Sequence, residues 1–256
     1  MTNEVHEAVR AACLWLPETD EISSHGSANF RVRGKTFATF VVNHHGDGRV
    51  ALWLNSPPGA QEWYLRSAAR QFFVPPYVGS RGWVGVHLDK GLSWRRIATL
   101  VREAYERVAP AGLTSTLGDT PPVRGPVRRL ARADIDPLVS SRGRSILKLM
   151  RKICLSLPET HEALQFGCPV WRAGKRAFAM VRAADRRFTV GFWVGVERQA
   201  VFAIDDRFTI PAYFGHNGWI SLDVTLHADP AEISALAGQS YRHFALKRML
   251  ARLTTD

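Results

Sequence analysis

The sequence has 256 residues, of which 46% are apolar and 10% aromatic, and this composition excludes a disordered chain and favours one or two cored domains. Its 34 basic residues outnumber 23 acidic ones, giving a formal net charge of +11, and a basic surface favours polyanionic partners. Charged residues interrupt every apolar run, and the first residues do not resemble a secretory signal. We therefore expect a globular cytoplasmic protein with no membrane association.

Hydrophobic periodicity predicts two helices flanking a strand-like region in the first part of the chain. Pro17 ends the first helix, Ser93 is placed to cap the last one, and a loop is expected after Pro17. The predicted elements are, in order, a helix over 4–16, strands near 28–33, 35–43 and 49–54, a short helix near 58–71, a strand at 83–88 and a helix at 93–108.

The composition changes abruptly after this region. Residues 110–126 contain four prolines and three glycines, and we expect no regular element there. An arginine-rich run follows, which includes Arg128, Arg129 and Arg132. We interpret residues 110–144 as a linker, either a solvated basic connection or an arm that lies along a phosphate backbone.

The remaining chain repeats the first pattern. Strands are predicted near 169–173, 175–183, 187–194 and 219–224, and helices near 145–157, 196–203 and 229–245, with room for the last helix to extend to Leu253. Asp229 and the proline after it are a strong signal for the start of that last helix.

Repeated residues show that the two parts are copies of one unit. The turn at 72–83 recurs at 208–219, with Phe, Pro, Tyr, two Gly and Trp at a constant offset of 136. Leu-Pro-Glu-Thr ends the first helix of each part. Trp53 and Tyr105 match Trp193 and Tyr241. Offsets that drift so little indicate two units of roughly 110 residues. The predicted domains are 1–109 and 145–256, joined by the linker 110–144.

The three cysteines give no sign of a metal site or a disulfide. Cys13 and Cys154 occupy matching places in two apolar helical stripes, so both are predicted to be small core residues. Neither they nor Cys168 belong to a CxxC or Cys/His pattern. No metal and no other cofactor is therefore expected.

Several repeated motifs in fixed order carry a family resemblance. They are Leu-Pro-Glu-Thr, a Gly-Lys hairpin followed by Phe-Ala, Pro-x-Tyr-x-Gly-x-x-Gly-Trp, and a tyrosine in the last helix. Together they resemble the MmcQ/YjbR family, and the resemblance covers both copies. The copies differ at two positions near these motifs, with Ala104 and Phe30 in the first where the second has Ser240 and Trp171.

The resemblance implies an α+β fold of two tandem two-layer α/β domains. Each domain would contain an antiparallel sheet with helices on one face, in the order α-β-β-β-α-β-β-α. The resemblance also implies a proposed DNA-binding role through a double wing of hairpins, with no catalytic residues attached. Since its members usually have one copy per chain, this tandem would be a monomer that acts as a built-in pseudo-dimer.

Four tryptophans are predicted on the sheet face opposite the aliphatic core: Trp53, Trp83, Trp193 and Trp219. Exposed together, they would form an apolar patch that needs a cover. The two copies could cover each other, the indoles could stack on nucleobases, or a groove between the copies could hold a small ligand.

No pattern of a dinucleotide site, a P-loop, a zinc protease or a serine hydrolase is present. The neighbouring residues His44 and His45 are predicted in a solvated hairpin turn, and Asp205 and Asp206 in a surface loop. The sequence therefore predicts a protein that is not an enzyme.

The predicted function is binding of nucleic acid, most simply duplex DNA, through basic residues that contact phosphates. The candidate residues are Arg31, Arg33, Lys35, Arg128, Arg129, Arg132, Arg172, Lys175 and Arg176. The alternative is a small-molecule or peptide-binding adaptor that uses a tryptophan-lined groove between the copies.

Overall fold

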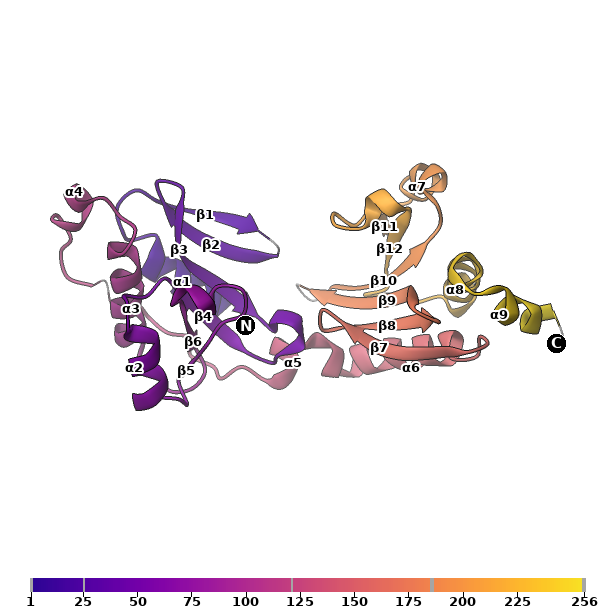
Figure 1. Ribbon diagram of the computed structural model, residues 1–256, viewed down its shortest axis with the longest axis horizontal. Helices are drawn as coiled ribbons and strands as arrows, with labels where there is room; N and C mark the ends of the chain where they lie inside the picture. Colours follow the sequence, from indigo (N-terminus) through magenta and orange to yellow (C-terminus); the bar gives the residue numbers. More distant parts are fainter. Residues whose placement is uncertain (1, 25, 121, 185–186, 255–256) are drawn as a thin grey trace. The chain divides into compact units, whose positions relative to one another are not determined.

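The computed structural model describes residues 2–24, 26–120, 122–184 and 187–254 (Figure 1). The chain divides into two compact units, Met1–Ile135 and Asp136–Asp256. Each unit contains a six-stranded antiparallel sheet with its main helices on one face, which confirms the predicted α+β fold of two tandem two-layer domains. Within the described ranges, no helix has the length and apolar character needed to span a bilayer.

The first unit follows the predicted order closely, and its strands are arranged β1-β2-β3-β4-β6-β5. Helices α1 and α3 contact each other and β3, and they bury the core residues Val9, Phe37 and Val101. The elements are α1 (Thr2–Cys13), β1 (Thr19–Ser24), β2 (Ser27–Val32), β3 (Lys35–Val42), β4 (Val50–Leu54), α2 (Ala60–Ser67), β5 (Phe72–Phe73), β6 (Val84–His87) and α3 (Trp94–Glu106).

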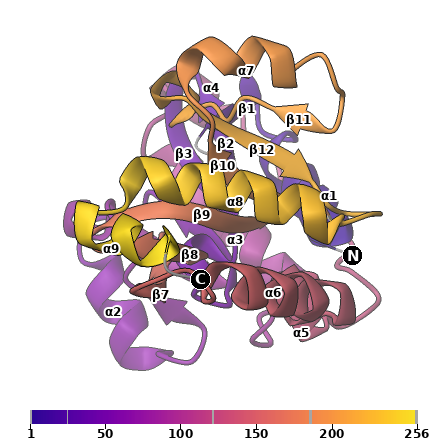
Figure 2. The same cartoon turned by 90° about the vertical axis from the view of Figure 1, so that its right-hand side faces the viewer.

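The second unit repeats this arrangement with the strand order β11-β12-β10-β9-β8-β7. Figure 2 shows α6 and α8 on the same face of this sheet, and both contact β9. The elements are α6 (Ser141–Cys154), β7 (Thr160–Gln165), β8 (Cys168–Ala173), β9 (Arg176–Ala184), β10 (Arg187–Trp193), α7 (Val196–Phe202), β11 (Phe208–Thr209), β12 (Trp219–Asp223), α8 (Pro230–Phe244) and α9 (Lys247–Ala251).

Three details differ from the sequence-based expectation. Strands β1 and β7 replace the loops expected after the first helix of each copy, because each pairs along six residues with the next strand although it carries few apolar side chains. The last helix stops at Phe244, since Ala245 is extended (φ −68°, ψ 145°), and α9 is a separate helix. A short helix, α4 (Ala111–Thr114), lies in the stretch where no regular element was expected.

The repeated tyrosines connect the last helix of each unit to the turn after the first helix. Tyr105 Oη donates a hydrogen bond to the carbonyl oxygen of Pro17 at 3.0 Å, and Tyr241 Oη donates to that of Pro158 at 2.8 Å. The Leu-Pro-Glu-Thr motif and the tyrosine of the last helix are therefore in contact through this hydrogen bond in each unit. The matched Cys13 and Cys154 are both buried, which confirms their prediction as core residues.

A glutamine that the sequence comparison missed holds each repeated Gly-Trp turn. In the second unit, Gln199 Nε2 donates to the carbonyl oxygens of Gly215 at 2.6 Å and Trp219 at 2.7 Å. The same pair of bonds recurs in the first unit, from Gln61 to the carbonyl oxygens of Gly79 at 2.8 Å and Trp83 at 2.6 Å. The turn is thus a structural motif stabilised from the neighbouring helix.

Strand register shows that Trp53 and Trp193 are not equivalent. Trp53 pairs with Gly85 on β6, whereas Gly191 pairs with Ser221, which matches Gly85 at the offset of 136. Trp193 lies two residues further along β10. The interpretation of the two tryptophans as a matched pair is therefore wrong, because the β3–β4 connection is longer than the β9–β10 connection.

In the second unit, the side chain of Ser240 connects two backbone groups whose counterparts in the first unit form a direct hydrogen bond. Its Oγ accepts a hydrogen bond from the Trp193 amide at 3.0 Å and donates to the Phe178 carbonyl at 2.5 Å. In the first unit, where Ala104 replaces the serine, the Asn55 amide donates directly to the Phe37 carbonyl at 2.9 Å. The serine hydroxyl thus bridges the two backbone groups.

Ser240→Ala is expected to destabilise the second unit by about 1–3 kcal/mol, because both backbone groups lose a buried partner. Urea unfolding followed by hydrogen exchange of second-unit peptides measures this loss. Ser145→Ala, on an exposed position of α6, serves as the control and should change stability by less than about 0.5 kcal/mol. Equal stability of the two variants would contradict the bridging role.

Candidate nucleic-acid interface

The hairpin arginines of the first unit are bound by carboxylates. Arg31 on β2 faces Asp20 on β1, and its guanidinium makes two bonds to that carboxylate, one of them at 3.0 Å from Nε to Oδ1. Arg33, in the β2–β3 turn, donates to Glu18 from Nε at 2.5 Å and from Nη2 at 3.1 Å. These hydrogen bonds lower the pKa of Glu18 and of Asp20, so both carboxylates are charged at neutral pH. Of the three predicted contacts here, only Lys35 is exposed without an ion pair among the described residues.

At the corresponding hairpin of the second unit, the arginine meets neutral acceptors. Arg172 occupies the place of Arg31, but the residue opposite it on β7 is His161 rather than an aspartate. Its Nη1 donates to the Lys175 carbonyl at 2.7 Å and its Nη2 donates to Gln165 Oε1 at 2.8 Å. Among the residues that the structure describes, no carboxylate is therefore paired with Arg172.

Lys175 and Arg176 extend this basic site at the tip of the β8–β9 hairpin. Both side chains are exposed, and neither forms an ion pair with any residue that the structure describes. Arg176 pairs with Ala173 as Lys35 pairs with Val32, so Arg176 is the counterpart of Lys35. The sequence-based alignment of Gly34-Lys35 with Gly174-Lys175 is therefore wrong by one residue.

The basic run after the first domain lies on the surface of the first unit. Arg128, Arg129 and Arg132 are exposed, and in the described part of the chain none of them is ion-paired. The neighbouring apolar residues Leu130 and Ile135 pack against the first core, which fixes this stretch to that unit. These three arginines are thus exposed cations that lie far from either hairpin in the sequence.

Trp53 and Trp83 are buried in a small cluster on the face of the first sheet that α1 and α3 leave uncovered. Val41, Ala51 and Phe73 complete this cluster. The β3–β4 loop covers it, because the ring of His44 lies edge-on to Trp53 with 4.9 Å between centroids. The prediction of a solvated turn is therefore wrong for His44. Its side chain is half-buried, and its Nε2 atom is inaccessible to solvent.

The two tryptophans of the second unit contact the end of α8. Trp193 stacks on His243 with 3.4 Å between ring centroids, and its Nε1 donates to the Asn217 carbonyl at 3.0 Å. Trp219 is buried and stacks on Phe244 with 5.9 Å between centroids. His243 thus covers one face of the half-buried Trp193 ring, and the burial of Trp219 leaves it little surface for the base stacking by which proteins bind single-stranded nucleic acid.

Two half-buried histidines of the first unit, His44 and His87, have lowered pKa values, so we expect this unit to lose stability in acid. Burial lowers the pKa of His44 and of His87, with a further lowering at His44 from the neighbouring His45, while Asp47 opposes the shift at both. Asp89 also opposes it at His87, whereas Arg49 and Lys90 reinforce it. A lowered folded pKa means that stability is fully present above the unfolded pKa of about 6.5 and is lost as pH falls through the folded value.

We therefore expect first-unit peptides to exchange amide hydrogens faster, after correction for intrinsic rates, at pH 5.5 than at pH 7.5. The double variant His44→Gln/His87→Gln should show a smaller dependence on pH, because it removes both titrating groups. If the variant keeps the full dependence, burial of these two histidines is not its cause.

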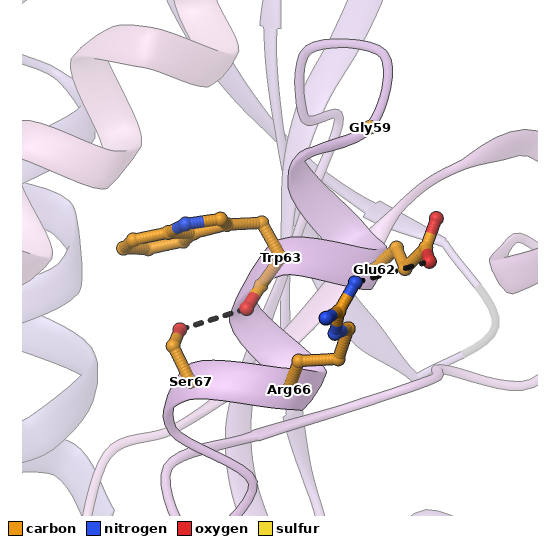
Figure 3. Close-up of a pocket in the computed structure, with 5 residues that line it drawn as sticks. All are labelled: Gly59, Glu62, Trp63, Arg66 and Ser67. Atoms are coloured by element: carbon orange, nitrogen blue, oxygen red, sulfur yellow. Dashed lines mark hydrogen bonds and ion pairs between the residues drawn. The ribbon is translucent and has the colours of Figure 1, made fainter.

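The surface of the first unit also has a shallow hollow, which lies on α2 (Figure 3). Its lining comes from one helix and the residue before it: Gly59, Glu62, Trp63, Arg66 and Ser67. Trp63 points to one side, while the Glu62–Arg66 ion pair of 3.9 Å lies on the other. No polar groups converge in it, and it contains none of the four predicted tryptophans, so it does not resemble a small-ligand site. Within the described ranges, no group of three or more His, Cys, Asp or Glu side chains is placed to hold a metal.

Comparison with known proteins identifies the family. A family model described as YjbR matches residues 14–107 and 155–243, once in each unit. The chain is also similar to the crystal structure of Deinococcus radiodurans protein DR2400, with domain DUF419, at 19% identity and a TM-score of 0.37, over 42% of this chain and 80% of that chain. No curated protein matches. Since the two matches span more than half of the chain, this protein belongs to the YjbR family and is a tandem two-copy member, as its repeated motifs predicted.

Proposed function

We propose that this protein is not an enzyme and that it binds nucleic acid, most simply duplex DNA, through the β8–β9 hairpin of its second unit. The observation that supports this proposal is the difference between the two hairpins. Arg172, Lys175 and Arg176 are not paired with carboxylates in the described structure, whereas Arg31 and Arg33 are.

Charge availability decides which hairpin binds a polyanion more strongly. An arginine already held by a bidentate carboxylate must give up that interaction before it can contact a phosphate, so little is gained. The cations of the β8–β9 hairpin have no such cost, and each phosphate that they neutralise releases condensed counterions from the duplex. The exposed residues Arg128, Arg129 and Arg132 would add to the attraction from the first unit.

The proposed contacts are with phosphates, and phosphates carry no sequence information. Arg172 is oriented by the Lys175 carbonyl and by Gln165, which leaves part of its guanidinium for one more acceptor. We therefore expect affinity that varies little among duplexes of mixed sequence.

Fluorescence polarisation of a labelled mixed-sequence duplex tests the proposal. We expect a Kd in the micromolar range at low salt, and a plot of log K against log salt with a slope of about −0.9 for each neutralised phosphate. Absence of binding in that range, or an affinity that salt does not change, would overturn the proposal.

A further inference from the structure

Glu159 is the second unit's counterpart of Glu18, yet it has different partners. Both glutamates follow the proline after the first helix, and both have left-handed backbones, with φ of 53° and 52°. Glu18 binds Arg33 of its hairpin. In the second unit Gly174 stands at the place of Arg33, so the hairpin does not offer the same partner.

The C-terminal helix α9 supplies the partners instead. Arg248 donates to Glu159 Oε2 from Nε at 3.0 Å and from Nη2 at 2.9 Å, and Arg252 Nη1 lies 3.4 Å from Oε1. Both carboxylate oxygens are therefore engaged. The hydrogen bonds from Arg248 lower the pKa of Glu159, so it is charged at neutral pH.

Packing holds α9 in place as well as these ion pairs do. Figure 2 shows where this helix lies in the second unit. Met249 is completely buried in the second core. Leu246, just before the helix, reaches the hairpin turn, where a Cβ placed on Gly174 would lie 3.8 Å from its Cδ1. The helix contacts the carboxylate of Glu159, and the residue before the helix contacts the hairpin turn.

We infer that α9 keeps the β8–β9 hairpin open to a polyanion by occupying Glu159 with Arg248 and Arg252. Without these arginines, the free carboxylate would attract Lys175, the residue after Gly174, and the hairpin would become neutralised like that of the first unit. The two arginines are then positioning residues for the binding site. This inference rests on the proposed function.

The rival explanation is that Arg248 and Arg252 contact phosphates themselves. The two explanations differ in what Glu159 does. If the arginines only occupy the carboxylate, removing its charge makes them dispensable. If they contact DNA, removing the carboxylate frees them and strengthens binding.

The test is a set of full-length variants measured by polarisation with the mixed-sequence duplex at low salt. Arg248→Gln/Arg252→Gln is expected to weaken binding about fivefold or more, because Glu159 then competes for the hairpin. Adding Glu159→Gln to this double variant should restore the affinity to within about twofold of wild type. Lys247→Gln removes one exposed charge from the same helix and leaves Glu159 paired, so it should weaken binding less than the double variant.

A triple variant that stays as weak as the double variant would overturn the inference, as would a double variant that binds like wild type. If the double variant disturbs α9, the DNA affinity of the single variant Glu159→Gln still distinguishes the two explanations. It should leave the affinity within about twofold of wild type, whereas a clear gain would support direct contact by the arginines. If wild type does not bind the duplex at all, the proposed function itself fails.

Discussion

Replacing Arg172, Lys175 and Arg176 together with glutamine is expected to lower the affinity for a mixed-sequence duplex by roughly tenfold to a hundredfold at low salt. These three cations make no ion pair within the described residues, so their removal leaves phosphates that nothing else in the hairpin neutralises. The salt slope should become shallower by about 0.9 for each phosphate that the variant no longer neutralises. Polarisation titrations at several salt concentrations measure both effects.

The matched control is Arg31→Gln/Arg33→Gln/Lys35→Gln, which removes the same formal charge from the hairpin of the first unit. Because Asp20 and Glu18 already neutralise both arginines, we expect the affinity to fall by less than about threefold. Equal decreases in the two variants would mean that net charge alone decides binding. An unchanged affinity in both would exclude both hairpins from the interface.

Gln199→Leu should destabilise the second unit by about 2–5 kcal/mol, a large part of the stability of a small domain. Its side-chain amide is buried and donates to the carbonyls of Gly215 and Trp219, and both would lose this donor. The carbonyl of Gly215 would keep its second bond, from the Gly218 amide at 2.8 Å. Urea unfolding combined with hydrogen exchange of the 208–219 peptide measures the effect.

Gln239→Leu is a suitable control in the same unit. Gln239 makes one long bond of 3.4 Å, to the Val194 carbonyl, and its removal should cost less than about 1 kcal/mol. If both glutamine variants are equally stable, the repeated turn does not depend on support from α7.

The fold follows from the sequence because the repeated residues are structural contacts. Each tyrosine of the last helix bonds the carbonyl of a proline far away in sequence, so the two motifs must recur together. The family resemblance therefore reports how each unit folds. The same residues carry no information about a partner, because their polar groups are occupied inside the unit.

The sequence did not predict which hairpin arginines are paired with carboxylates, because this pairing depends on a strand that has no clear hydrophobic pattern. Strand β1 has little apolar alternation and was expected to be a loop, so Asp20 was not placed opposite Arg31. The exchange of this aspartate for His161 in the second copy therefore went unnoticed. Loops of unequal length also shifted the apparent matches, as for Trp53 and Trp193.

Hydrogen exchange of the full-length protein with and without a mixed-sequence duplex tests the central claim most directly. We predict slower exchange in peptides that cover residues 168–178 when the duplex is present, and unchanged exchange over residues 27–42. Protection confined to residues 27–42, or equal protection of both hairpins, would contradict a binding surface carried by the second unit.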